Sequence, residues 1–163
     1  MSRKLVLIII DGLTPQVFEE AVTRGTAPAL TFLAEHGNYR RGVSTFPSLT
    51  PVCLSSIATG AHPSQHGIPG LVWYDREHGR IVEYGSSFAA IRAVGSRRAI
   101  RDAVITMNRD HLSRATPTIF ETLEGAGLTT AAVNFTVYRG PVAHRSTLGS
   151  LVPAVEGDRK SVV

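Results

Sequence analysis

A threonine at the start of a short helical pattern is the first side chain of this sequence that could carry chemistry. Thr50 follows the turn-forming pair Pro47-Ser48, and Pro51 suits the first position of a helix. The apolar pattern that follows predicts a short helix ending near Gly60. Thr50 would then lie among the unpaired backbone N–H groups of a helix N-terminus, where a phosphate is stabilised. Its hydroxyl is a candidate nucleophile, and the alternative is that Thr50 only caps the helix.

A carboxylate at the end of an apolar run is the second candidate. Residues 5–10 are continuously apolar and rich in β-branched side chains, which predicts a strand buried on both faces of a parallel sheet. The run stops at Asp11, and open α/β sheets bind ligands at the carboxyl ends of their strands. We expect Asp11 and Thr50 to reach the same edge of one sheet.

Other side chains have weaker patterns around them. His62 and His66 are four residues apart and could bind a metal, but the surrounding loop is rich in Pro and Gly, which favours a structural role. Cys53 is expected to be a small packing residue rather than a reactive thiol. Trp73 and Tyr74 are expected to pack in a hairpin rather than to stack on bases. Ordinary surface or loop roles are expected for five residues without a motif: Asp75, His78, Asp110, His111 and His144.

The elements that would position these residues alternate between helical and strand patterns. Helical patterns cover residues 14–35, with an interruption near 25–28, then residues 50–60, residues 97–104 and a segment that opens at 116–117. Strand patterns cover residues 5–10, 39–46 and 128–135, and a hairpin is predicted from residues 71–74 and 80–84. Strands alternating with helices predict an α/β fold with a doubly wound, mostly parallel sheet.

Composition narrows the class of protein. The length of 163 residues suits one domain or part of a larger one, and the 43% of apolar residues is enough to form a core. The net charge is +4, and the basic residues are scattered apart from those at 97, 98 and 101, so no nucleic-acid polymer is expected as a partner. No signal peptide or bilayer-spanning run is seen, which predicts a cytoplasmic protein without a membrane partner. The single cysteine excludes an intramolecular disulfide, and the oligomeric state is left open.

Taken in order, the motifs resemble the type I phosphodiesterase / nucleotide pyrophosphatase family of the alkaline phosphatase superfamily. The matching pieces are Asp11-Gly12 after the first strand, Phe46-Pro47-Ser48-Leu49-Thr50, Ala58-Thr59-Gly60, and His62-Pro63 with His66-Gly67-Ile68. The resemblance covers about residues 3–150 and implies an incomplete sheet of the alkaline-phosphatase-like type.

The resemblance implies roles for Asp11 and Thr50. Asp11 matches the family's first metal-ligating aspartate, and Thr50 matches its nucleophile, which also contacts a metal. The implied cofactor is a pair of divalent metal ions, with Zn²⁺ as the expected metal. Metal coordination makes a poorly nucleophilic hydroxyl into an alkoxide, and cations stabilise a phosphoryl group together with a helix N-terminus. The implied reaction is hydrolysis of a phosphodiester or pyrophosphate bond in a small phosphorylated substrate through a phospho-threonine intermediate.

Spacing decides between two candidate threonines, and the residue type at position 50 excludes sulfatase activity. Thr45 is a rival nucleophile, because Thr45-Phe46-Pro47 also resembles a family motif. Thr50 lies nine residues before Thr59, which matches the family spacing, whereas Thr45 is five residues too early. Leu71 departs from the pattern, since nucleotide pyrophosphatases carry there an asparagine that helps to hold a phosphate oxygen. Sulfatases of the same fold need Cys or Ser where this chain has Thr50, which excludes a sulfatase.

The family needs further metal ligands, and none of the required Asp and His residues follows residue 144. We therefore expect residues 1–157 to be the N-terminal part of a single alkaline-phosphatase-like catalytic domain, inactive alone. Residues 158–163 read as the translation of a sequencing adapter, which predicts a non-native tail. Two other functions stay open: a non-catalytic α/β fragment or binding module in which Thr50 only caps a helix, and a phosphotransferase or mutase on the same fold.

Overall fold

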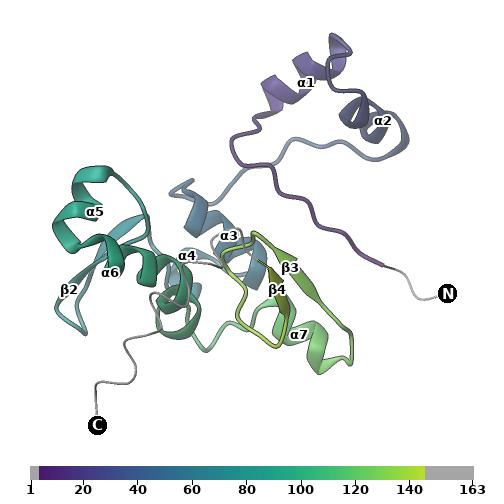
Figure 1. The fold of residues 1–163 in the computed structure, drawn as a ribbon. Coiled ribbons are helices and arrows are strands. Elements are labelled where there is room, and N and C mark those ends of the chain that lie inside the picture. Colours follow the sequence, from purple (N-terminus) through teal and green to yellow (C-terminus); the bar gives the residue numbers. More distant parts are fainter. Residues whose placement is uncertain (1–3, 146–163) are drawn as a thin grey trace. The chain divides into compact units, whose positions relative to one another are not determined.

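The chain divides into two units, residues 1–43 and residues 44–163, in a computed structural model that describes residues 4–145. Figure 1 traces both units, from purple at the N-terminus to yellow-green near residue 145. The second unit contains both helices and short strands, which makes it an α/β arrangement. Among residues 4–145, no helix is both long enough and apolar enough to cross a membrane. The predicted tail at residues 158–163 lies outside the described residues.

The first unit contains two short helices among its described residues. α1 (Pro15–Thr23) and α2 (Pro28–His36) each begin with a proline, which suits the first turn of a helix. Thr14 caps α1, because its Oγ1 accepts the Val17 N–H at 3.3 Å. The predicted helical region with its interruption near residues 25–28 is confirmed.

The extended segment before α1 departs from its prediction. Residues 5–10 were expected to form a buried strand, but their apolar side chains are 38–80% exposed. Residues 4–43 contain no strand with which this segment could pair, and residues 39–46 also run without strand pairing. A strand is defined by the partner to which it is hydrogen-bonded, and a local apolar pattern does not supply that partner. The predicted doubly wound sheet is therefore not seen among residues 4–145.

The second unit holds the remaining elements. Its helices are α3 (Thr50–Thr59), α4 (Pro63–His66), α5 (Phe88–Val94), α6 (Ser96–Arg101), the π-helix η1 (Asp102–His111) and α7 (Ile119–Gly125). Its strands are β1 (Val72–Asp75), β2 (Arg80–Glu83), β3 (Ala131–Val133) and β4 (Ala143–Arg145). The helix predicted at residues 97–104 is present, but it passes from α6 into η1.

The strands of the second unit form two small sheets. β1 and β2 are antiparallel, with Asp75 opposite Arg80, so the predicted hairpin is confirmed. β3 and β4 are parallel, with Ala132 opposite His144. No pattern predicted β4, in which His144 stacks on Tyr138 with the ring centroids 3.9 Å apart. These pairs are the sheet structure of residues 4–145.

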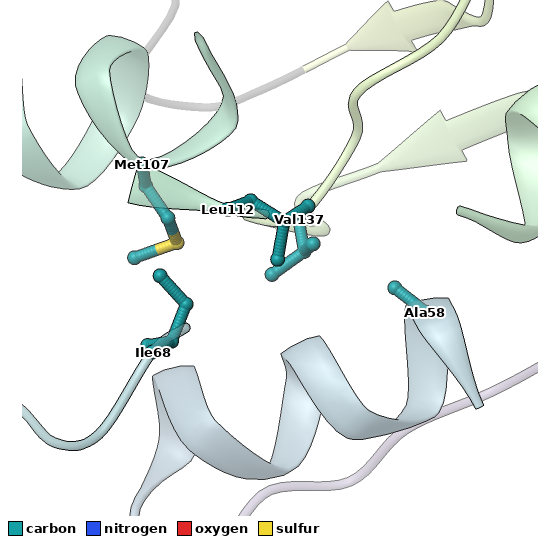
Figure 2. Close-up of a cluster of buried hydrophobic side chains, with 5 residues drawn as sticks. All are labelled: Ala58, Ile68, Met107, Leu112 and Val137. Carbon is teal, nitrogen blue, oxygen red and sulfur yellow. The ribbon is translucent and has the colours of Figure 1, made fainter. Parts of the chain in front are cut away.

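A buried apolar cluster holds the second unit together. Figure 2 shows its side chains, which are Ala58, Ile68, Met107, Leu112 and Val137. Each is at most 2% exposed. Burial of a large apolar side chain contributes about 1.5–3 kcal/mol to the free energy of unfolding. The cluster therefore joins α3, the loop after α4 and the C-terminal half of η1 into one packed body.

Candidate active site

α3 begins at Thr50, whose side chain is exposed at the N-terminus of the helix. The preceding residue, Leu49, has extended backbone angles of φ −116° and ψ 143°, and its aliphatic side chain offers no capping acceptor. The prediction that Thr50 caps the helix is wrong by one residue, because Thr50 is already helical. The first turn of α3 carries no acidic side chain, so no carboxylate of that turn competes with an anion at the positive end of the helix dipole.

The far side of α3 is seated in the second unit. Its buried residues are Pro51, Val52, Ser55 and Ala58. Gly60 ends the helix as predicted, with a left-handed φ of +66°, and its N–H donates to Ser56 O at 2.8 Å. Cys53 is half-buried on the same helix. α3 thus presents Thr50 to solvent from a helix whose opposite side is fixed.

The two histidines of the loop after α3 have different surroundings. His66 is fully buried, and its ring contacts Ser56 Oγ through Nε2 at 3.1 Å and the Ile68 N–H through Nδ1 at 3.1 Å. His62 is exposed, and its backbone N–H donates to Gln65 Oε1 at 3.1 Å. Burial lowers the pKa of His66, and the nearby His62 acts in the same direction. These contacts give His66 the structural role that the Pro- and Gly-rich loop predicts.

Asp11 is exposed at a turn that follows the extended segment. In that turn the Leu13 N–H donates to Ile10 O at 3.4 Å, and Gly12 has a φ of +75°, which L side chains rarely adopt. Asp11 belongs to the first unit and Thr50 to the second. The prediction that both reach one sheet edge therefore stays a prediction.

The predicted metal site is only partly represented in the described chain. Asp11 and Thr50 offer oxygen donors, which divalent cations bind. Among residues 4–145, no three His, Cys, Asp or Glu side chains gather in a way that could hold a metal ion. The assignment of Asp11 and Thr50 as metal ligands therefore stays a prediction.

Arg80, at the start of β2, is the centre of a partly buried polar network that no sequence motif revealed. Its Nη1 donates to both carboxylate oxygens of Asp102 at 3.1 Å, and its Nη2 donates to His111 Nε2 at 3.0 Å. Tyr84 Oη lies 2.7 Å from His111 Nδ1, and the Trp73 ring packs edge-on against His111 with the centroids 5.4 Å apart. The ordinary surface or loop role expected for His111 is wrong, whereas the hairpin packing expected for Trp73 is confirmed.

The contacts of this network fix the protonation of its members. A guanidinium only donates, so His111 Nε2 must accept, and the neutral ring carries its hydrogen on Nδ1. Burial lowers the pKa of His111, an effect that Asp102 opposes and Arg80 reinforces. Burial also raises the pKa of Tyr84. Both rings are therefore uncharged at neutral pH, while Asp102, 2% exposed, forms an ion pair with the Arg80 side chain, which is 24% exposed.

The hairpin register contains a signal that could have revealed part of this network. Opposed residues of an antiparallel pair share a face, so Asp75 and Arg80 lie on the side of the fully buried Val82. Charged side chains at inward positions indicate internal partners. Asp75 also closes the turn, since it accepts the backbone N–H of His78 at 3.2 Å, which confirms its loop role. Tyr74 is 60% exposed, so the packing expected for it is wrong.

Comparison with known proteins identifies the family of the chain. The type I phosphodiesterase / nucleotide pyrophosphatase family matches residues 5–157, a span that includes Asp11 and Thr50. The alkaline phosphatase PafA of Elizabethkingia meningoseptica is 44% identical over 50 residues, which are 31% of this chain and 9% of that protein. The chain therefore aligns with only a small part of that relative's length. No solved structure matches the chain significantly.

Proposed function

Because the chain belongs to the type I phosphodiesterase / nucleotide pyrophosphatase family, we propose that it functions in metal-dependent hydrolysis of phosphodiester or pyrophosphate bonds. The substrates are small phosphorylated molecules. Thr50 is the nucleophile and forms a phospho-threonine intermediate, and Asp11 and Thr50 are ligands of the divalent metal. Membership in the family favours this function over a non-catalytic binding module, in which Thr50 would have no chemical role.

The position of Thr50 is the observation that supports the proposal most directly. Its side chain is exposed on the first residue of a ten-residue helix, and that helix is held by its buried side. Backbone N–H groups at a helix N-terminus point toward an anion that lies there, and the helix dipole adds positive potential. A phosphoryl group at this place is therefore within the field that stabilises its charge while the hydroxyl attacks.

The proposed step exchanges one ester bond for another. Thr50 Oγ forms a bond to phosphorus while the bond from phosphorus to the leaving oxygen breaks. The hydroxyl proton is lost to solvent, and the leaving oxygen takes up a proton when it departs. Two divalent ions, with Zn²⁺ as the expected metal, would supply a lowered hydroxyl pKa and positive charge when bound. Water then hydrolyses the phospho-threonine, which restores the Thr50 hydroxyl and releases the phosphoryl product.

Replacement of the nucleophile tests the proposal. In a full-length protein that contains this chain, Thr50→Ala is expected to lower the hydrolysis of an aryl phosphodiester in the presence of Zn²⁺ by roughly 10³-fold or more, because the attacking oxygen is removed. Release of the phenol measures turnover, and mass spectrometry of acid-quenched protein measures phosphate on the peptide that contains Thr50.

Thr45→Ala is the matched control, because Thr45 lies in the same segment and also resembles a family motif. Its turnover and phosphate labelling should equal those of the unmodified protein. Undiminished turnover by Thr50→Ala would remove Thr50 as the nucleophile. Phosphate trapped on Thr45 would transfer the role to that residue.

A further inference from the structure

His66 makes contacts on both sides of its ring, although it touches no residue to which the reaction is assigned. The ring joins Ser56 of α3 to the backbone of Ile68, and it has no exposed surface. Its own carbonyl oxygen accepts the Ser113 N–H at 2.9 Å. The side chain therefore lies at the point where α3, the loop after α4 and the segment after η1 meet.

The donor types around the ring determine where its hydrogen lies. A backbone N–H can only donate, so the bond from Ile68 requires His66 Nδ1 to be an unprotonated acceptor. The neutral ring must then carry its hydrogen on Nε2, from which it donates to Ser56 Oγ. A protonated ring would lose the Ile68 bond and would bury an unpaired charge. His66 thus donates one hydrogen bond to α3, from its Nε2 to Ser56 Oγ.

The other end of this connection is rigid. Ile68 belongs to the buried cluster with Ala58, and Figure 2 shows both side chains in the core of the second unit. Gly67 has a φ of +81°, and a Cβ added there would lie 3.1 Å from His111 O, so the loop passes close to the end of η1. The loop therefore cannot shift easily, and it holds the His66 ring in a fixed position beside α3.

We propose that His66 is a positioning residue for Thr50, because its Nε2–H bond to Ser56 fixes α3 against the core. This inference rests on the proposed function of Thr50. Ser56 lies six residues after Thr50, about 9 Å along the helix axis, so His66 acts through the helix and not on the reacting atoms. A helix transmits a shift at Ser56 to its first residue, and small misplacements of a reacting group lower rates strongly.

Two substitutions of His66 separate the bond to α3 from the bond to the loop. His66→Asn keeps an acceptor near the position of Nδ1, whereas His66→Gln keeps a donor near the position of Nε2. We expect His66→Asn and Ser56→Ala to shift the amide NMR resonances of Thr50 and Val52, and His66→Gln to leave them close to those of the unmodified chain. His62→Gln is the matched control, because His62 is an exposed histidine of the same loop. Its Thr50 and Val52 resonances should not move.

Turnover adds a second readout. In a full-length protein that contains this chain, His66→Asn is expected to lower kcat for the aryl phosphodiester roughly tenfold with little change in KM, and His66→Gln should restore it. Ser56→Ala should lower kcat equally, and the double variant with His66→Asn should lower it no further. ¹⁵N NMR of the ring should show hydrogen on Nε2 and a bare Nδ1.

Each result bears on the inference separately from the proposed function. Hydrogen on Nδ1, or unchanged Thr50 and Val52 resonances in His66→Asn, would overturn the positioning role even if Thr50 proves essential. Full turnover by Thr50→Ala would overturn the proposed function, while the NMR shifts would still report whether His66 fixes the start of α3.

Discussion

At the scale of single residues, His111 makes the stability of the second unit depend on pH. Charged groups face its ring from several elements: Arg80 on β2, Asp75 on β1, and Asp102 and Asp110 on η1 itself. A proton on Nε2 would remove the bond from Arg80 and place two cations side by side. Burial is the largest cause of the lowered pKa of His111, and the attraction of Asp102, which exceeds the repulsion from Arg80, opposes it only in part.

The sign of the resulting pH dependence follows from linkage. The unfolded chain, in which His111 has its ordinary pKa of about 6.5, binds a proton more readily than the folded chain. The contribution of neutral His111 to the free energy of unfolding is therefore fully present above about pH 6.5. It is lost as the pH falls toward the lowered pKa of His111 in the folded chain. Urea midpoints at about pH 7.5 and about pH 5.5 measure this loss.

His111→Gln should reduce the difference between the two urea midpoints. His36→Gln replaces an exposed histidine of the first unit and should leave the difference unchanged. An unaltered difference in His111→Gln would show that other groups, such as the buried His66, carry the acid sensitivity.

At the scale of elements, a single arginine ties α7 to the segment after η1. The Arg139 side chain is 8% exposed, and its Nε donates to Glu121 Oε1 at 3.0 Å. Its Nη1 donates to Leu112 O at 2.7 Å and to Ser113 O at 3.1 Å, and its Nη2 donates to Thr116 O at 2.6 Å. One planar group thus satisfies the carbonyls of a turn and a carboxylate of the helix that follows it.

Arg139→Gln is expected to lower the free energy of unfolding by about 3 kcal/mol, because the carbonyls lose their donors and Glu121 loses its cation. Urea denaturation followed by circular dichroism measures the change. Arg92→Gln is the matched control, since Arg92 is exposed on α5, and its effect should stay within about 0.5 kcal/mol. Equal midpoints for Arg139→Gln and Arg92→Gln would contradict the role given to Arg139.

At the scale of the whole molecule, the segment that leads out of the first unit is exposed and without helix or strand. Residues 38–43 are exposed, and Arg41 in this segment is paired with Glu19, its Nε donating to Oε1 at 2.7 Å. We expect limited trypsin treatment to cut between α1 and α7 first at Arg40. Mass spectrometry of the early fragments identifies the site, and Arg40→Gln should delay this cut. A first cut inside α6 or η1 would contradict the expectation.

Elements with local signals could be predicted from the sequence. The sequence predicts α3 from its Thr-Pro start and its terminal glycine, and it predicts the hairpin from the strand patterns at residues 71–74 and 80–84. The run at residues 5–10 carried only an apolar pattern, and its pairing depends on a partner distant in sequence. The three-residue strand β4 was too short for a period to show.

The candidate site was predictable to a similar extent. The helix start at Thr50 was predicted from local sequence. The phosphodiesterase family of the chain was predicted from the motifs and their spacing. The burial of His66 and most of the network around Arg80 could not be predicted, because the side-chain partners lie 10 to 31 residues away along the chain. Polar residues without a motif acquire their role only from the tertiary contacts that surround them.

The contacts of Arg80 with Asp102 and His111 depend on how η1 is wound. Its hydrogen bonds run from residue i to i+5, about 4.4 residues per turn, so the nine steps from Asp102 to His111 make about two full turns. Both side chains then project from the same side of the helix, within reach of one guanidinium. In an α-helix of about 3.6 residues per turn, the same nine steps make about two and a half turns, and the two side chains would project from opposite sides. Any rewinding of η1 into an α-helix must therefore release Arg80 from either Asp102 or His111.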